Sequence, residues 1–259
     1  MVVWLLEREV FADQEQGVAA AAKDAGDRVV WWRDDWWFDS RWPNLEGARV
    51  VFHGSLGNAD RIHRELAWTP GAFCSTARFA CSSWWPAVAD QLVADRYLIT
   101  TVSHLVAAGP PIDFGARVFV RPDSPLKPFS GRVLDSGGVT LQALDHGYYY
   151  DDEDLPVVVM PAVKIGDEWR LIAAGGGIAA GSGYVADGRT GSEPIGPTHP
   201  AWGYAASLLE RIPTPDPIFV LDVCETESGL RLLELNPFSG ADLYACDREA
   251  VVSSVHSVL

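Results

Sequence analysis

The sequence predicts two folded parts, a small parallel α/β domain at the N-terminus and a larger α+β domain with largely antiparallel sheets. In the first part strands alternate with helical segments, which is typical of a parallel sheet. In the second part short strands follow one another directly, separated by Gly, Pro and Asp turn signals, which is typical of antiparallel pairing. We expect the two domains to cover residues 1–85 and 86–259.

The N-terminal part contains three apolar runs that predict strands. They are VVWLL from Val2 to Leu6, RVVWW from Arg28 to Trp32, and ARVVFHGS from Ala48 onward. An alanine-rich stretch from Val18 to Lys23 lies between the first two and predicts a helix. Because a helix connects two strands, a parallel arrangement is favoured.

The rest of the chain changes from helical to strand patterns. Helical runs from Val88 to Val93 and from Ser103 to Ala108 end at Gly109-Pro110-Pro111. The strands that follow are RVFVRP, GRVLD, LPVVVMPAVKI, EWRLIAAGG, PIFVLDV and LRLLELN. Gly175-Gly176-Gly177 predicts a hairpin turn, and we expect the C-terminal tail to be irregular.

Composition limits the classes of function. The chain has 259 residues, 48% of them hydrophobic, so it can bury a substantial core. Its net charge of −15 disfavours nucleic acid and anionic membranes as partners. The opening apolar run is shorter than a signal-peptide core, and the four cysteines form no C-x-x-C pair, so we expect a cytoplasmic protein.

Acidic and amide side chains gather in the last predicted hairpin, PIFVLDVCETESGLRLLELN. Side chains alternate along strands, so we expect two sets that each share a face: Ile218, Val220, Asp222 and Cys224, and Leu230, Leu232, Glu234 and Asn236. With an odd number of residues in the connecting loop, Asp222 and Glu234 lie opposite each other. Opposed carboxylates among apolar residues repel each other and lose solvation, a cost that bound magnesium offsets. The sequence therefore predicts a magnesium site at Asp222, Glu234 and Asn236.

Another interpretation of this acidic pair stays open. Asp222 and Glu234 are also compatible with two solvated strand residues that hold no metal. A slip of one residue in register would put them on opposite faces. Asn236, followed by Pro237, adds a third oxygen ligand and favours the metal site. No histidine pair, G-x-S-x-G elbow or G-x-G-x-x-G loop in the sequence offers another chemistry.

Asp222 followed twelve residues later by ELN resembles the metal-binding end of ATP-grasp enzymes. In that superfamily an Asp on one strand and a Glu-x-Asn on the next coordinate the magnesium ions that bridge the phosphates of ATP. The resemblance covers about Asp95 to Tyr244. It implies a pre-ATP-grasp α/β domain followed by an ATP-grasp domain whose antiparallel sheets sandwich ATP, so that ATP and magnesium are the expected cofactors.

A second stretch, RVFVRPDSPLKPFSGRV, resembles the strand, flexible loop and strand that cover the phosphates in ATP-grasp enzymes. Arg121 stands where the usual pattern has a lysine, so the chain resembles a branch with arginine in that role. The resemblance implies that Arg121, Lys127 and Gly131 contact the nucleotide, and that Arg121 takes part in catalysis. A strand-end surface arginine and a solvated lysine are the alternatives.

A third stretch, LPVVVMPAVKIGDEWRLIAAGGG, resembles the hinge that reads adenine. By this resemblance the hinge residues are Met160, Pro161, Ala162 and Val163, and Glu168 bonds the ribose. Arg170 shares a strand face with Glu168 and is expected to reach the phosphates or a carboxylate substrate as a second catalytic residue. An ordinary surface ion pair between Glu168 and Arg170 is the alternative.

Taken together, the three stretches imply an ATP- and magnesium-dependent ligase that joins a carboxylate to an amine through an acyl phosphate. The expected substrate is an amino acid, a peptide or another small molecule, and a homodimer is left open. One alternative is a phosphotransferase on the same scaffold. Another is a non-catalytic binding module that uses the Trp-rich segment from Trp31 to Trp42.

Overall fold

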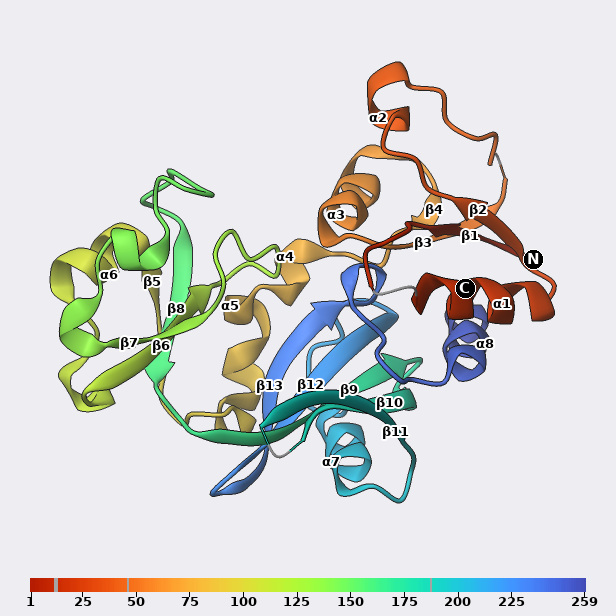
Figure 1. The fold of residues 1–259 in the computed structure, drawn as a ribbon. Helices are drawn as coiled ribbons and strands as arrows, with labels where there is room; N and C mark the ends of the chain where they lie inside the picture. The colour runs from red at the N-terminus through yellow and green to blue at the C-terminus, as the bar shows by residue number, and fades with distance from the viewer. Residues whose placement is uncertain (12–13, 46, 187) are drawn as a thin grey trace.

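The computed structural model describes residues 1–11, 14–45, 47–186 and 188–259, and these are arranged around three β-sheets (Figure 1). One sheet of four strands is parallel, whereas a central sheet of five strands and a second sheet of four strands are antiparallel. This arrangement confirms the predicted fold class, parallel α/β in the N-terminal part and antiparallel α+β in the rest.

The parallel sheet has the strand order β2-β1-β3-β4. Its strands are β1 (Val2–Leu6), β2 (Arg28–Trp31), β3 (Arg49–His53) and β4 (Thr69–Gly71). Helices α1 (Gln14–Asp24) and α3 (Leu56–Glu65) pack against opposite faces, α1 beside Trp4 and α3 beside Leu5. Every residue of β1 is buried as a result, which is why this strand is apolar throughout.

The Trp-rich segment packs largely against itself and against the parallel sheet. It includes the short helix α2 (Trp36–Asp39). The ring of Trp32 lies 5.3 Å from that of Trp36, 5.5 Å from that of Trp37 and 5.4 Å from that of Phe52, all with edge-to-face geometry. Such contacts are typical of aromatic core packing. Much of this aromatic surface is therefore used within the domain.

Short helical turns connect the parallel sheet to the rest of the chain. They are α4 (Thr76–Phe79), α5 (Cys81–Trp84) and η1 (Trp85–Gln91). The expected helix from Val88 to Val93 was misplaced. Pro86 favours an earlier start of the 3₁₀ turns. Val88 is itself non-helical with φ of −133°, and Leu92 is extended.

The antiparallel sheet of four strands has the order β5-β8-β6-β7. Its strands are β5 (Leu98–Thr101), β6 (Arg117–Pro122), β7 (Arg132–Asp135) and β8 (Pro156–Pro161). Helix α6 (Val102–Ala108) ends at Gly109, which has a positive φ, as the sequence predicts. Three 3₁₀ turns complete this part: η2 (Ile112–Phe114), η3 (Ser136–Gly138) and η4 (Gln142–Leu144).

The central sheet has the order β11-β10-β9-β12-β13. Its strands are β9 (Ile165–Ala174), β10 (Gly177–Ala186), β11 (Arg189–Ile195), β12 (Ile218–Thr226) and β13 (Gly229–Pro237). Gly175 and Gly176, both with positive φ, form the predicted hairpin turn. Strands β10 and β11 were not foreseen, and α7 (Pro200–Leu208) packs against Leu171 and Val223 on one face of this sheet.

One predicted strand is divided between two sheets. The run LPVVVMPAVKI ends as β8 at Pro161 and resumes as β9 at Ile165, so residues 162–164 cross from one antiparallel sheet to the other. Pro161 cannot donate a hydrogen bond to a sheet ladder, which explains an end to pairing at this point. The crossing lies at the base of the cavity described below.

The C-terminal tail is helical, so the expectation of an irregular tail was wrong. After the 3₁₀ turn η5 (Phe238–Gly240), helix α8 runs over Arg248–Val258 and lies beside α1 (Figure 1). The Asp247 carboxylate accepts hydrogen bonds from the N–H groups of Glu249 and Ala250 and so caps α8. Burial of Val251 and Val255 outweighs the weak helix propensity of valine.

The N-terminal sheet is joined closely to the turn that follows β13. The Gly54 N–H donates to the Ser239 carbonyl at 2.9 Å, and the Phe73 N–H donates to Ser239 Oγ at 2.9 Å. The boundary between residues 85 and 86 stays a prediction. Within the ranges described above, no helix is long and apolar enough to cross a membrane.

Candidate functional site

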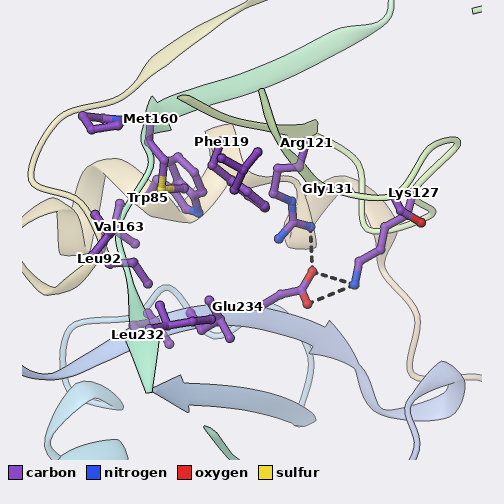
Figure 2. A pocket seen from close by; sticks show the side chains of 16 residues that line it. Trp85, Leu92, Phe119, Arg121, Lys127, Gly131, Met160, Val163, Leu232 and Glu234 are labelled. Atoms are coloured by element: carbon purple, nitrogen blue, oxygen red, sulfur yellow. Dashed lines mark hydrogen bonds and ion pairs between the residues drawn. The ribbon is translucent and has the colours of Figure 1, made fainter. Parts of the chain in front are cut away.

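A cavity of about 440 Å³ lies between the antiparallel sheet of four strands and the edge strand β13 (Figure 2). One end is apolar and is formed by Trp85, Leu92, Phe119, Met160, Val163 and Leu232. The other end carries Arg121, Lys127 and Glu234. A cavity with one apolar end and one charged end suits a ligand that joins an aromatic ring to a charged group.

Strand pairing builds the apolar wall. Phe119 on β6 faces Met160 on β8 across the ladder, and both side chains line the cavity. Gly131, directly before β7, leaves room for the Phe119 ring in this wall. A Cβ atom at residue 131 would lie 2.6 Å from Cζ of Phe119, so only glycine fits without moving the aromatic ring.

Three charged side chains meet at the other end of the cavity. Arg121 Nη2 lies 2.6 Å from Glu234 Oε1, and Lys127 Nζ lies 2.9 Å from the same oxygen. Burial opposes ionisation of Glu234, but the charges of Arg121 and Lys127 outweigh it and lower the pKa of Glu234 to about 2. Burial likewise opposes the charge on Arg121, and Glu234 outweighs it and raises the pKa of Arg121.

Lys127 reaches Glu234 from the loop between β6 and β7, which we call the flap (residues 123–131). The Lys127 backbone has φ of +48°, an uncommon conformation for a residue other than glycine. Its side chain remains 41% exposed, whereas that of Arg121 is 9% exposed. Arg121 is therefore a buried part of the cavity wall, whereas Lys127 is a more exposed cation that reaches the cavity from the flap.

Asp222 and Glu234 face each other across β12 and β13, so the register is the one that the metal site requires. A two-residue turn, Glu227 and Ser228, joins the strands, and a bulge at Leu233 supplies the odd residue. Because of the bulge, Leu232 pairs with Val223 and lies on the face opposite to Glu234. The expectation that Leu230 and Leu232 share the face of Glu234 and Asn236 was wrong.

Asp222 is buried beside Arg170 rather than inside the cavity. Arg170 Nε donates to Asp222 Oδ1 at 2.8 Å and Nη2 donates to Oδ2 at 2.7 Å. Asn236 Nδ2 donates to the same Oδ2 at 2.9 Å. Asp222 is only 2% exposed. These three charge-assisted hydrogen bonds, two of them from the Arg170 guanidinium, satisfy its buried carboxylate.

The rings of Tyr184 and Tyr244 form cation–π contacts with the Arg170 guanidinium. The rings of Tyr184 and Tyr244 stack with centroids 4.9 Å apart, and the guanidinium carbon lies 5.6 Å and 5.0 Å from their centres. Burial opposes the charge on Arg170, but Asp222 outweighs it and raises the pKa of Arg170. The Tyr184 hydroxyl donates to Glu168 at 2.6 Å, and burial raises the pKa of Glu168.

The donor set of the hairpin fits magnesium. Asp222, Glu234 and Asn236 offer two carboxylates and an amide oxygen on adjoining positions of one sheet face, and magnesium takes such hard oxygen ligands together with phosphate oxygens and water. No group of three or more His, Cys, Asp or Glu side chains with metal-binding geometry occurs among residues 1–11, 14–45, 47–186 and 188–259. Three protein oxygens would leave coordination positions of magnesium for phosphate oxygens and water.

The structure separates the predicted site residues into two groups. The residues that line the cavity are Arg121, Lys127, Gly131, Met160, Pro161, Val163 and Glu234. Those outside its lining are Ala162, Glu168, Arg170, Asp222 and Asn236. The Ala162 N–H donates to the Arg117 carbonyl at 3.1 Å. The roles of all these residues in binding and catalysis stay predictions.

Sequence reasoning missed most of the apolar wall. Phe119 lies two residues before Arg121 on the same strand, so period-two alternation would have found it. Trp85, Leu92 and Leu232 carry no motif. They come together through tertiary packing, since they are also part of one buried cluster.

Comparison with protein families identifies one that is described as the ATP-grasp domain, R₂K clade family 3, and its model matches residues 57–255. This range contains every predicted site residue. A comparison with curated proteins finds no match.

Three solved structures share the fold over nearly the whole chain. A RimK domain ATP-grasp protein from Sphaerobacter thermophilus has a TM-score of 0.67 at 14% identity, covering 98% of this chain and 100% of that one. The ATP-grasp ligase PsnB, in complex with a phosphomimetic variant of its minimal precursor, Mg and ADP, has a TM-score of 0.58 at 14% identity, with 99% and 98% covered. The macrocyclase MdnC from Microcystis aeruginosa, bound with precursor peptide MdnA, has a TM-score of 0.58 at 12% identity, with 99% and 100% covered.

Proposed function

The chain belongs to the ATP-grasp superfamily, in the clade family whose model it matches, and from this premise we propose that it is an ATP- and magnesium-dependent ligase that joins a carboxylate to an amine. The observation that carries the proposal is the cavity beside β13. Its charged end holds Arg121, Lys127 and the candidate metal ligand Glu234. Its apolar end matches a purine base in character.

Arg121 and Lys127 are proposed to bind the phosphates of ATP. Both cations contact Glu234 in the structure, at 2.6 Å and 2.9 Å. Phosphate oxygens compete for the same donors, and an arginine can form two parallel hydrogen bonds to them. Because the Lys127 side chain is 41% exposed and that of Arg121 only 9%, we expect Lys127 to follow the nucleotide while Arg121 stays in place.

Asp222, Glu234 and Asn236 are proposed to hold magnesium. Bound magnesium would neutralise negative charge on the phosphates and polarise the phosphoryl group. Arg170 binds both oxygens of Asp222, so we propose that it positions this carboxylate. A direct contact between Arg170 and a substrate carboxylate stays a prediction, as does a contact between Glu168 and the ribose.

The proposed reaction needs no nucleophilic side chain. A substrate carboxylate oxygen bonds to the γ-phosphorus, the bond from this phosphorus to the β–γ bridging oxygen breaks, and ADP leaves. An amine then attacks the carbonyl carbon of the acyl phosphate, phosphate leaves, and the amine nitrogen loses a proton. The chain's part is to place the groups, balance their charge and exclude water by closing the flap.

The substrate is proposed to be an amino acid or a peptide. Two structures with the same fold contain a precursor, the PsnB complex with a phosphomimetic variant of its minimal precursor and the MdnC complex with a precursor peptide. They share only 14% and 12% identity with this chain, so they support the substrate class and not a particular sequence.

Isothermal titration calorimetry with ATP and magnesium tests the nucleotide proposal. We expect the wild type to bind, and the double variant Asp222→Asn, Glu234→Gln to lose about tenfold to a hundredfold in affinity. Melting curves for both proteins show whether the variant is folded. Absence of heat in the folded wild type would contradict the proposal.

Product analysis separates a ligase from a phosphotransferase. The enzyme is incubated with ATP, magnesium and mixtures of amino acids or peptides, and the products are identified by mass spectrometry. A ligase yields an amide with one ADP and one phosphate per bond. A phosphorylated acceptor without any amide would support the phosphotransferase instead.

A further inference from the structure

Trp85 carries a buried hydrogen-bond donor without an acceptor. The residue is 1% exposed and lines the cavity, yet its indole nitrogen Nε1 has no hydrogen-bond partner among the described residues. The neighbouring Trp84, equally buried, donates from Nε1 to the Phe79 carbonyl at 3.3 Å. An unpaired buried N–H is costly and uncommon in native proteins, so the one on Trp85 calls for an explanation.

The position of the ring makes a ligand the natural acceptor. Figure 2 shows Trp85 beside Met160 and Val163 in the apolar wall of the cavity. Edge-to-face contacts with two rings hold that of Trp85. Its centroid lies 6.0 Å from the centroid of Trp84 and 5.1 Å from that of Tyr97. A donor held in this way loses little conformational freedom when a ligand binds.

The hinge offers fewer donors than the family resemblance implies. Pro161 has no N–H, and the Ala162 N–H is already bonded to the Arg117 carbonyl at 3.1 Å. At the other end of the cavity, Arg121 and Lys127 are held by Glu234. A purine bound at the apolar end has ring nitrogens that need donors, and half of the hinge residues cannot supply one.

We propose that the Trp85 indole N–H donates a hydrogen bond to a ring nitrogen of the purine of ATP. Trp85 then recognises the base, in place of the backbone donors that Pro161 and Ala162 do not provide. This inference rests on the proposed function, because it requires a purine nucleotide in the cavity. It assigns Trp85 to base recognition and leaves the chemistry at the γ-phosphate to other residues.

A calorimetric cycle tests the contact. Wild type and Trp85→Phe are each titrated with ATP and with 1-deaza-, 3-deaza- and 7-deaza-ATP in the presence of magnesium. In each analogue a C–H replaces one ring nitrogen. We expect Trp85→Phe to bind ATP about tenfold more weakly, and one analogue to bind the wild type about tenfold more weakly than ATP does. The same analogue and ATP should bind Trp85→Phe equally, since the contact is already lost.

Trp84→Phe is the matched control. It removes an equally buried indole that does not line the cavity. Its affinity for ATP should stay within about twofold of the wild type, because a phenyl ring at residue 84 can keep the edge contact that holds Trp85. Equal losses in Trp84→Phe and Trp85→Phe would overturn the inference, because they would indicate a general packing effect.

The remaining outcomes separate this inference from the proposed function. If the wild type binds ATP and all three deaza analogues equally, the proposed role of Trp85 is wrong and the nucleotide site is still supported. This outcome needs only the wild type, so it holds even if Trp85→Phe does not fold. If one analogue loses affinity equally in the wild type and in Trp85→Phe, another donor reads that nitrogen and the role of Trp85 is also wrong. If the folded wild type binds no nucleotide, the proposed function fails and the inference fails with it.

Discussion

The two ends of the cavity are built by different forces. The charged end depends on three side chains, Arg121, Lys127 and Glu234, and both cations form ion pairs with the one carboxylate within 3.0 Å. The apolar end depends on packed side chains such as Trp85, Met160 and Leu232 and on Gly131, which leaves room for the Phe119 ring. Loss of one charge should therefore leave a partner unpaired, whereas a change in side-chain size at the apolar end should create a clash or a void.

The largest effect is expected from Glu234→Ala. This change leaves Arg121 charged and buried without its partner, so the free energy of unfolding should fall by about 3 to 5 kcal/mol. Urea unfolding measures this loss. Glu225, an exposed glutamate on β12, offers the control. Glu225→Ala should change stability by less than about 0.5 kcal/mol. Equal changes in the two variants would show that the ion pair does not stabilise the charged end.

Acid should also lower the free energy of unfolding, because it protonates Glu234. The pKa of Glu234 is lowered from an ordinary value of 4.5 to about 2 in the folded protein. A lowered folded pKa stabilises the protein above pH 4.5, and this contribution is lost as the pH falls towards 2. The loss should reach about 3 kcal/mol, from about 1.4 kcal/mol for each unit of pKa.

Urea unfolding of the wild type and of Glu234→Gln between pH 7 and pH 3 isolates this contribution, because other carboxylates titrate in both proteins. The difference in unfolding free energy between them should shrink as the pH falls. A difference that stays constant over this range would contradict the lowered pKa of Glu234.

At the apolar end Gly131→Ala should act through shape. The new Cβ would lie 2.6 Å from Cζ of Phe119. The ring must therefore move, at a cost of about 1 to 3 kcal/mol. Because Phe119 lines the cavity, ATP should also bind more weakly, as calorimetry can measure. Gly137→Ala has no atom within 4 Å of the new Cβ and serves as the control. Matching results for the two variants would show that the wall tolerates the added methyl group.

The smallest effect on stability is expected from Lys127→Ala. The lysine side chain is 41% exposed. Exposed ion pairs contribute less than about 1 kcal/mol. Nucleotide affinity should nevertheless fall about tenfold, because the phosphates lose a cation. Lys23→Ala, on the distant helix α1, should leave ATP binding unchanged. If Lys127→Ala binds ATP as the wild type does, the flap lysine does not contact the phosphates.

Local patterns in the sequence were sufficient for much of the fold. Apolar runs and turn residues predicted β1, β6, β7 and β12 and the hairpin turn at Gly175, since these depend on neighbouring residues alone. The spacing of Asp222 and Glu234 allowed opposed positions only if an odd number of residues in the connection stayed unpaired. The bulge at Leu233 that produces this register left no signal in the sequence, because a bulge is decided by the pairing of two strands.

The tertiary structure decided which residues share the cavity. Trp85 and Leu232 are far apart in the chain and meet only because two sheets and a helical turn pack together. Packing in another core cluster makes the C-terminal tail a helix. Glu168 is bonded to Tyr184 and lies outside the cavity lining. The sequence by itself determined the fold class and the order of charged motifs, which are local properties. The three-dimensional arrangement alone decided the apolar wall and the unpaired Trp85 donor, because burial depends on contacts between distant segments.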